Sequence, residues 1–387
     1  MKCNWTTKKL SEIAYINPRE SLGKGVVAKK VPMDKLQPFC RDIPEFVLEE
    51  YKGGTKFRNG DTIMARITPC LENGKIAKVS VLSDGEVGFG STEYIVFRAI
   101  DGVSDADFLY YLICSPLVRN PAIKSMVGSS GRQRVQTDVV ANLDVELPPI
   151  EEQRKIGGLL KAIDDKIELN DVINNNLLQQ LHILYSRLFC NSAMDTPLGE
   201  VVATTSGGTP SRKHDEYYSD SSICWVKSKE LLGNYIHETE ERINDLAIKK
   251  SSAKLLPKHS VLIAMYGATV GACGVISKPM TCNQAVCALL CNENYPYTYL
   301  FQIAYESQQK FINLAVGSAQ QNISQVLIKQ LNLHSDLNII QKFHGLALPM
   351  HQEIESLQAE NMHLAALRDN LLPKLMSGEL DVSNIDL

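Results

Sequence analysis

The sequence predicts an α/β (α+β) fold in which two repeated, β-rich α/β domains are separated by a pair of long coiled-coil helices. Three observations lead to this prediction: an internal repeat of about 187–189 residues, short β-branched runs in each half, and one long apolar seam after each half. The chain has 387 residues, 44% hydrophobic and 22% charged, so it is long enough to bury two cores.

The repeat is visible in several blocks. The sequence GDTIMA at 60–65 corresponds to HSVLIA at 259–264, the tripeptide VGS occurs at 127 and again at 316, and QR at 153 corresponds to QK at 341. A period this long is too large for a solenoid unit. Each half therefore contains a β-rich stretch, a short helix and a long helix.

Short elements are indicated within each half. The β-branched runs Asp61–Ile67, Lys75–Leu82 and Glu93–Arg98 are bounded by Gly, Pro and Asn, which is typical of strands. The apolar runs Asp107–Cys114 and Tyr299–Tyr305 predict short buried helices.

The long helices are predicted over 151–190 and 338–380. In each helix ten seam positions alternate spacings of four and three residues, which is the pattern of a coiled coil. Glu151 and Glu152 suit the first helical turn, and Pro373 is expected to end or kink the second helix. The first seam is Ile156, Leu160, Ile163, Ile167, Asn170, Asn174, Leu177, Leu181, Leu184 and Leu188; the second is Phe343, Ala347, Met350, Ile354, Leu357, Asn361, Leu364, Arg368, Leu371 and Leu375.

Two seams of equal length predict that the helices pair with each other inside one chain. Asn174 and Asn361, which we call the seam asparagines, occupy equivalent positions and are expected to fix the register of the pair, because a buried Asn in an apolar seam penalises other registers. The alternative is that each helix packs on its own domain and the asparagines lie at a frayed edge.

The net charge of −4 is unevenly distributed. Residues 1–150 carry 20 basic and 18 acidic side chains, and residues 196–336 carry 12 of each. Residues 151–195 carry 5 basic and 7 acidic, and residues 337–387 carry 3 and 7. The acidic excess lies in the two helical segments, so the two larger domains are expected to meet a different partner from the helices.

Common catalytic and metal-binding patterns are not found. The sequence has no phosphate-binding P-loop, no dinucleotide fingerprint and no H-E-x-x-H, so we expect no catalytic residues and no metal. His344 and His351, seven residues apart, are expected to be solvated. The ten cysteines include no C-x-x-C pair and are interpreted as reduced, mostly packed thiols. No run of about 18 apolar residues and no signal peptide is seen, which predicts a cytoplasmic protein that does not contact a membrane.

Polar loops beside the predicted strands are candidates for DNA contacts, since Arg and Gln make bidentate contacts to guanine and adenine. The loop GSSGRQRV at 128–135 is the strongest candidate, with a solvated loop as the alternative. Its counterpart at 317–322 is rich in amides, so the two loops should prefer different bases. The residues proposed in the first domain are Arg66, Thr68, Asn73, Lys75, Ser91, Thr92, Arg132, Gln133 and Arg134; those in the second are Arg212, Lys213, Lys227, Lys229, Gln320, Gln321 and Asn322.

For two segments that contain candidates of the second domain, the sequence also predicts a local structure. The segment SGGTPSRK at 206–213 is interpreted as a flexible basic loop. Lys227 and Lys229 are expected on one face of a strand, either as DNA contacts or as the protection of an exposed strand edge.

Several of these segments are similar to motifs of a known protein family. The chain resembles the specificity subunit of type I restriction-modification enzymes over essentially its whole length. The motifs that carry the resemblance are ITPCLENGK (67–75), GSTEYIV (90–96), GSSGRQRV (128–135), LPPIEEQRKI (147–156), SGGTPSRK (206–213) and LLPKLMSGELDV (371–382). One departure is the segment SDLNIIQ at 335–341, which lacks the Pro-Pro and both glutamates of LPPIEEQ.

The resemblance implies two target recognition domains, 1–150 and 196–336, that each read one part of an asymmetric, interrupted site in double-stranded DNA. It implies that the two helices are antiparallel and act as a ruler and as the docking surface for two methyltransferase subunits and, through them, restriction subunits. It also implies a non-catalytic chain, with S-adenosylmethionine, ATP and Mg bound by the partner subunits only. The alternative from another class is a coiled-coil assembly scaffold that does not read DNA.

Overall fold

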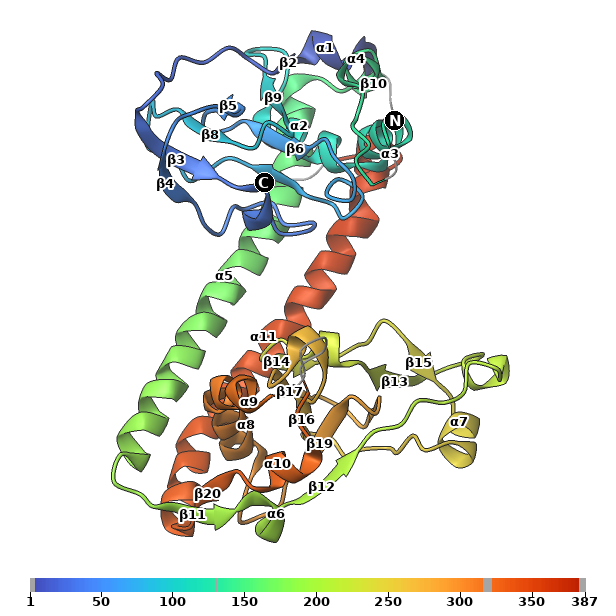
Figure 1. Ribbon diagram of the computed structural model, residues 1–387. Coiled ribbons are helices and arrows are strands. Elements are labelled where there is room, and N and C mark those ends of the chain that lie inside the picture. Colours follow the sequence, from blue (N-terminus) through green and yellow to red (C-terminus); the bar gives the residue numbers. More distant parts are fainter. Residues whose placement is uncertain (1–3, 130, 316–321, 383–387) are drawn as a thin grey trace. The chain divides into compact units, whose positions relative to one another are not determined.

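The structure, a computed structural model, describes residues 4–129, 131–315 and 322–382. The chain forms two compact units. Unit 1 comprises the residues up to Glu168 together with those from Met362 onward, and unit 2 comprises Leu169–Asn361. Each unit thus contains one part of each of the two 40-residue helices, α5 (Ile150–Phe189) and α11 (Leu337–Met376) (Figure 1).

Unit 1 is built around two four-stranded sheets, with strand orders β2-β9-β6-β7 and β4-β3-β8-β5, and a separate pair β1-β10. The three strands expected from the sequence are present. Two of them, β6 and β7, are shorter than the β-branched runs, whereas β9 has six residues, as expected, and begins one residue later. The elements are β1 (Thr6–Lys9), α1 (Leu10–Ile13), β2 (Ala14–Ile16), β3 (Val27–Val31), β4 (Val47–Glu50), β5 (Lys56–Phe57), β6 (Thr62–Ala65), β7 (Ile76–Lys78), β8 (Gly88–Gly90), β9 (Tyr94–Ala99), α2 (Ala106–Cys114), α3 (Pro116–Lys124), α4 (Thr137–Ala141) and β10 (Asp144–Leu147).

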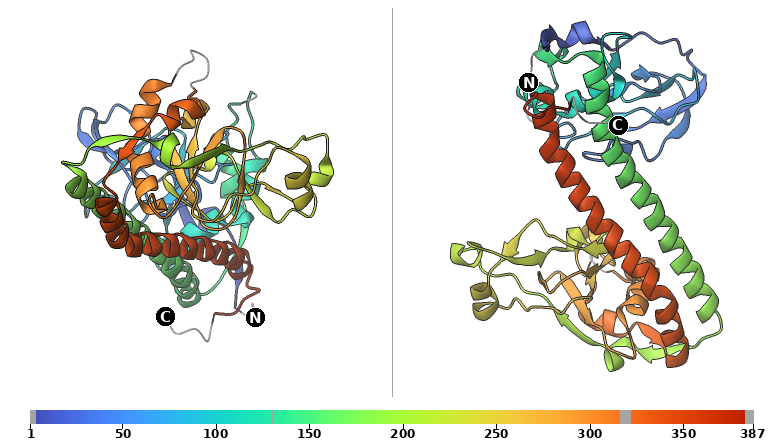
Figure 2. Two further views of the ribbon diagram at one scale, coloured as in Figure 1. Left: turned by 90° about the horizontal axis from the view of Figure 1, so that it is seen from below. Right: turned by 180° about the vertical axis from the view of Figure 1, so that it is seen from behind.

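Unit 2 has a five-stranded sheet of order β12-β19-β16-β17-β14, a three-stranded sheet β15-β13-β18 and the pair β11-β20. Helix α8 packs against β16 and β17, and α11 runs beside this unit in all three views (Figures 1 and 2). The elements are β11 (Met194–Pro197), α6 (Leu198–Val201), β12 (Ala203–Ser206), β13 (Ile223–Val226), β14 (Asn234–Ile236), β15 (Arg242–Ile243), α7 (Asp245–Lys250), β16 (Val261–Ala264), β17 (Cys273–Ile276), β18 (Thr281–Cys282), β19 (Val286–Leu290), α8 (Tyr297–Glu306), α9 (Gln308–Leu314), α10 (Gln325–Lys329) and β20 (Asn332–His334).

The internal repeat is confirmed by topology. The order β2-β9-β6-β7 in unit 1 corresponds to β12-β19-β16-β17 in unit 2. Register agrees as well, because Ala65 at the end of β6 pairs with Tyr94 as Ala264 at the end of β16 pairs with Val286. This register allows residues of the two units to be matched one by one.

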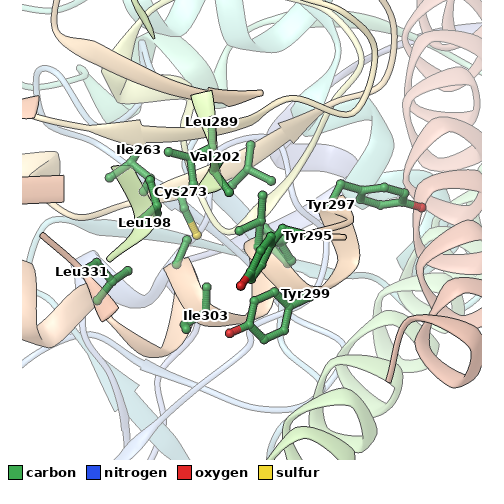
Figure 3. Packing of buried hydrophobic residues seen from close by; sticks show 14 of the residues in the cluster. Leu198, Val202, Ile263, Cys273, Leu289, Tyr295, Tyr297, Tyr299, Ile303 and Leu331 are labelled. Atoms are coloured by element: carbon green, nitrogen blue, oxygen red, sulfur yellow. The ribbon is translucent and has the colours of Figure 1, made fainter. Parts of the chain in front are cut away.

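Each unit has its own core, as the two predicted domains require. In unit 2 the side chains of β16, β17, β19 and α8 meet those of both long helices. Tyr295 and Tyr299 lie beside each other in this cluster, whereas Tyr297 points toward a long helix (Figure 3). In unit 1 the expected helix α2 is buried along most of its length, from Phe108 to Ile113, against β6 and β9 and the first turns of α5. Both short buried helices predicted from the sequence are confirmed.

The predicted seams are buried or half-buried at all twenty positions. Within unit 1, Ile156 and Leu160 of α5 share a core with Leu375 and Met376 of α11. Within unit 2, Leu181 shares a core with Phe343 and Ala347, together with residues of the unit's sheet. The helices therefore pair antiparallel in each unit and also pack on the domain core, so both arrangements considered from the sequence occur together.

The seam asparagines do not meet. Asn361 accepts a hydrogen bond from Asn170 (2.8 Å) and donates one to Asp171 (2.8 Å), one helical turn before Asn174. Asn174 is 5% exposed, and its amide has no hydrogen-bond partner among the described residues. In an antiparallel pair, two equivalent positions lie opposite each other only at the centre of the pair. Asn174 and Asn361 are one helical turn away from that arrangement.

A further expectation about the long helices is corrected. His351 is not solvated but completely buried, with Nδ1 2.8 Å from the Tyr235 hydroxyl, while His344 is half-buried with Nδ1 2.9 Å from Thr298 Oγ1. The expectation for Pro373 agrees with the structure, because helix α11 ends at Met376, within the turn that contains this proline.

The described cysteines are free thiols, and Cys224, Cys273, Cys282 and Cys287 are buried as expected. Within the described ranges, no helix has both the length and the apolar character needed to cross a membrane.

Candidate nucleic-acid interface

Most of the predicted contact residues of unit 1 lie at one place, where the end of β6, the start of β9 and the loop after α3 are next to one another. The backbone N–H of Arg66 donates to the Glu93 carbonyl (2.9 Å), and the N–H of Val135 donates to the Arg66 carbonyl (2.8 Å). Arg134 forms isolated bridges with Ile67 and Val127. This frame places three segments that are distant in sequence beside one another.

A charged triad of Arg66, Glu93 and Arg134 lies at the centre of this frame. Arg134 donates from Nε and Nη2 to the Glu93 carboxylate at 2.7–3.0 Å, while Arg66 Nε lies 4.0 Å from the same carboxylate. Arg134 is 48% exposed and Glu93 22%. The hydrogen bonds from Arg134 lower the pKa of Glu93, so the carboxylate stays ionised at neutral pH.

The remaining candidates of unit 1 differ in availability. Thr68 is held to the same loop, since its N–H donates to the Gln133 carbonyl (3.0 Å). Arg132, Asn73 and Thr92 are exposed. Lys75 donates to the Met33 carbonyl (2.8 Å), and Ser91 Oγ accepts from the Glu93 N–H (3.1 Å). The structure thus brings Thr68, Ser91, Thr92 and Gln133 to the triad, whereas Asn73 and Lys75 belong to the neighbouring turn.

Unit 2 repeats the backbone frame with different side chains. The N–H of Met265 donates to the Ala285 carbonyl (2.8 Å), and the N–H of Ile323 donates to the Met265 carbonyl (2.9 Å). Tyr266 and Asn322 form the bridge that corresponds to Ile67 and Arg134. Asn322 therefore lies at the position expected from the repeat; Gln320 and Gln321 lie outside the described residues.

The basic residues after β12 form a second cluster in unit 2. The guanidinium of Arg212 lies over the rings of Tyr218 (4.4 Å) and Trp225 (5.5 Å). Arg212 and Lys227 both form ion pairs with Glu241. Lys213 is exposed. Arg212 and Lys227 are therefore available to an anionic partner only if Glu241 is displaced or shared.

Two expectations about this region are wrong. Lys227 and Lys229 are not on a strand face, because β13 ends at Val226 and the chain turns into a 3-10 helix, Ser228–Glu230. The strand is also not an edge, since it lies between β15 and β18. At the start of the segment 206–213 the backbone is closely packed, because a Cβ at Gly207 would lie 2.1 Å from the Cys282 carbonyl oxygen.

Sequence reasoning missed Glu93 and Tyr266. Glu93 lies in the motif GSTEYIV (90–96), directly after the candidates Ser91 and Thr92, but a carboxylate is not expected where DNA phosphates approach. Tyr266 is 40% exposed beside Asn322, and only the register of the repeat could have identified it. Among the residues that the structure covers, no group of three or more His, Cys, Asp or Glu side chains could hold a metal ion.

The family described as "Type I restriction modification DNA specificity domain" matches residues 3–179 and 193–335, once for each half of the repeat. The class of protein is therefore a two-module DNA specificity protein with no catalytic role of its own. The chain belongs to the type I restriction-modification specificity family.

Individual relatives agree with this assignment. The chain is similar to the type I restriction enzyme MjaIX specificity subunit of Methanocaldococcus jannaschii, with 25% identity over 318 residues, 74% of this chain and 71% of the relative. It is 32% identical over 185 residues to the EcoAI specificity subunit of Escherichia coli, covering 46% of this chain but only 31% of that relative. The crystal structure of the type I S subunit from M. genitalium shows the same fold, with a TM-score of 0.60, 14% identity and 96% coverage of each chain.

Proposed function

We propose that the chain is the specificity subunit of a type I restriction-modification complex and reads a bipartite, asymmetric site in double-stranded DNA. The observation that carries the proposal is the repeated frame: one backbone arrangement presents Arg66, Glu93 and Arg134 in unit 1 but Met265, Ala285 and Asn322 in unit 2. Two modules with one fold and different polar side chains suit two different half-sites.

The long helices are proposed to dock two methyltransferase subunits and, through them, restriction subunits. The support is chemical, because residues 151–195 and 337–387 carry the acidic excess and would repel DNA. Exposed apolar side chains such as Leu169 (53%), Val172 (51%) and Ile183 (49%) along α5 are also suited to a protein partner. In this assembly S-adenosylmethionine, ATP and Mg are bound by the partners, and the complex acts in the cytoplasm.

The helices are further proposed to act as a ruler between the two half-sites. The first seam of 33 positions from Ile156 to Leu188 corresponds to about 50 Å of helix at roughly 1.5 Å per residue. A continuous helix curves only gently, so its length is suited to fixing the unread spacer.

Methylome sequencing of the host with and without this gene tests the proposal. We expect one interrupted, asymmetric methylated motif to disappear on deletion and to return when the gene is restored. Persistence of every methylated motif, in cells that express a type I methyltransferase subunit, would contradict DNA specificity and favour the coiled-coil scaffold.

A further inference from the structure

All three charged residues of the unit 1 triad are replaced by uncharged residues at the equivalent positions of unit 2. Arg66, Glu93 and Arg134 correspond to Met265, Ala285 and Asn322, and the backbone hydrogen bonds at these positions are the same within 0.1 Å. The fold therefore does not need the charges, since unit 2 forms the frame without them.

Stability does not explain the triad either. Arg134 is about half exposed, and exposed ion pairs contribute little to folding because water screens them and both side chains lose conformational freedom. The remaining explanation is recognition.

We propose that Glu93 is a positioning residue that holds Arg134 so that its end reads a guanine in the half-site of unit 1. This inference rests on the proposed function and names the base that this site reads.

The hydrogen-bond geometry determines which face of Arg134 is free. A guanidinium carries five N–H groups, and Glu93 accepts from Nε and from Nη2. Both hydrogens of Nη1 and the second hydrogen of Nη2 remain. These form the two-donor end of the side chain, which matches the O6 and N7 acceptors that guanine presents in the major groove.

The charge of Glu93 adds selectivity. A free arginine binds the phosphates of any sequence, whereas one held by a carboxylate has a smaller net charge and a fixed direction. Arg66, 4.0 Å from the same carboxylate, keeps the cluster net positive beside DNA. Arg132 provides a contrast within the same loop, because it is exposed and forms no ion pair with a described residue. It is expected to contact phosphate.

The first test uses base analogues. The full chain with its methyltransferase partners is titrated against duplexes that carry the motif defined by methylome sequencing, with 7-deazaguanine replacing each guanine of the half-sites in turn. Removing N7 at one position should weaken wild-type binding on the order of 10-fold. Arg134→Lys, which keeps the charge but cannot make both sets of contacts, should be insensitive at that position.

The second test isolates Glu93. Glu93→Gln should lower the ratio of target to non-target affinity on the order of 10-fold, mainly by strengthening non-target binding, and should lower the sensitivity to 7-deazaguanine at the same position. The contrasting variant Arg132→Ala should weaken binding to target and non-target DNA by the same factor. A purely electrostatic role of Glu93 predicts instead an equal gain on all DNA.

The outcomes separate the two proposals. If wild-type complex binds no preferred sequence, the proposed function fails and this inference falls with it. If it binds its motif but no guanine is sensitive to 7-deaza substitution through Arg134, or Glu93→Gln strengthens binding equally on all sequences, only the inference is overturned. The combined variant Arg66→Met, Glu93→Ala and Arg134→Asn should fold, because unit 2 holds these side chains in the same frame, and should lose the guanine preference.

Discussion

Burial of His351 predicts that unit 2 loses stability in mild acid. The imidazole ring is fully buried, and Nδ1 forms a hydrogen bond with the Tyr235 hydroxyl. Nε2 has no hydrogen-bond partner among the described residues. Burial, reinforced by His344 and His259, lowers the pKa of His351 from 6.5 to about 3. The folded state therefore holds the ring neutral at a pH where the unfolded chain would bind a proton.

The direction and the size of the change in unfolding free energy follow from the linkage between proton binding and folding. Because the folded pKa is depressed, the unfolded state binds more protons below about pH 6.5, and stability falls as the pH falls from there toward 3. Each pH unit in this window costs about 1.4 kcal/mol, so lowering the pH from 7 to 5 should cost about 2 kcal/mol from this residue alone.

Urea denaturation at pH 7 and pH 5 measures this effect. The chain has two tryptophans, Trp5 and Trp225, so a Trp5→Phe background makes fluorescence report on unit 2 through the buried Trp225. His351→Gln, which keeps an acceptor for Tyr235, should remove about 2 kcal/mol of the pH dependence.

The matched control is His363→Gln, the same substitution at an exposed position of the same helix. Burial also lowers the pKa values of His237, His259, His334 and His344, so the wild-type loss should exceed the contribution of His351, and only the difference between variants isolates it. An unchanged pH dependence in His351→Gln would refute the reasoning.

Three further predictions concern packing and length. Arg368→Met leaves Asp164, 5% exposed and bonded to Arg368 at 2.8 Å, without its cation, and should cost about 3–5 kcal/mol in urea denaturation. Gly207→Ala drives a Cβ into a backbone carbonyl and should lower the melting temperature, whereas Gly345→Ala on an open face of α11 should raise stability by about 0.5–1 kcal/mol. Inserting one heptad after each seam asparagine preserves the seam and should lengthen the unread spacer of the methylated motif without changing either half-site.

Each of these predictions has a result that would count against it. Arg368→Met combined with Asp164→Asn should recover part of the lost stability; no recovery would mean that the ion pair is not the cause. Equal effects of the two glycine variants would contradict the close approach at Gly207. A heptad variant that folds, assembles with its methyltransferase and still methylates the original spacing would show that the helices are not the ruler.

Several details of the candidate site were beyond sequence reasoning because they depend on where elements end. Lys227 and Lys229 alternate as strand residues do, yet β13 ends at Val226 and a 3-10 turn follows. A strand of four residues is too short for alternation to define its boundary. The same limit explains why the predicted runs Asp61–Ile67 and Lys75–Leu82 are longer than the observed β6 and β7.

The sequence by itself determined the repeat, the two modules, the long helices and the short buried helices. These features come from the period of apolar residues, which is local information that each segment carries alone. The seam predicted which positions of α5 and α11 are buried, but not that Asn361 meets Asn170 rather than Asn174. The relative shift of two helices is set by all the contacts along both, not by one pair.

Only the tertiary structure decided which side chains form the site. Arg134 and Glu93 are 41 residues apart and Arg66 lies on a third segment, and they meet because β6, β9 and the loop after α3 share one set of backbone hydrogen bonds. Strand register fixes such meetings, and a shift of one residue would turn each side chain to the opposite face. Composition and motifs do not contain that register. The sequence therefore indicated the loop that carries Arg134, whereas only the structure showed that the Glu93 carboxylate accepts its hydrogen bonds.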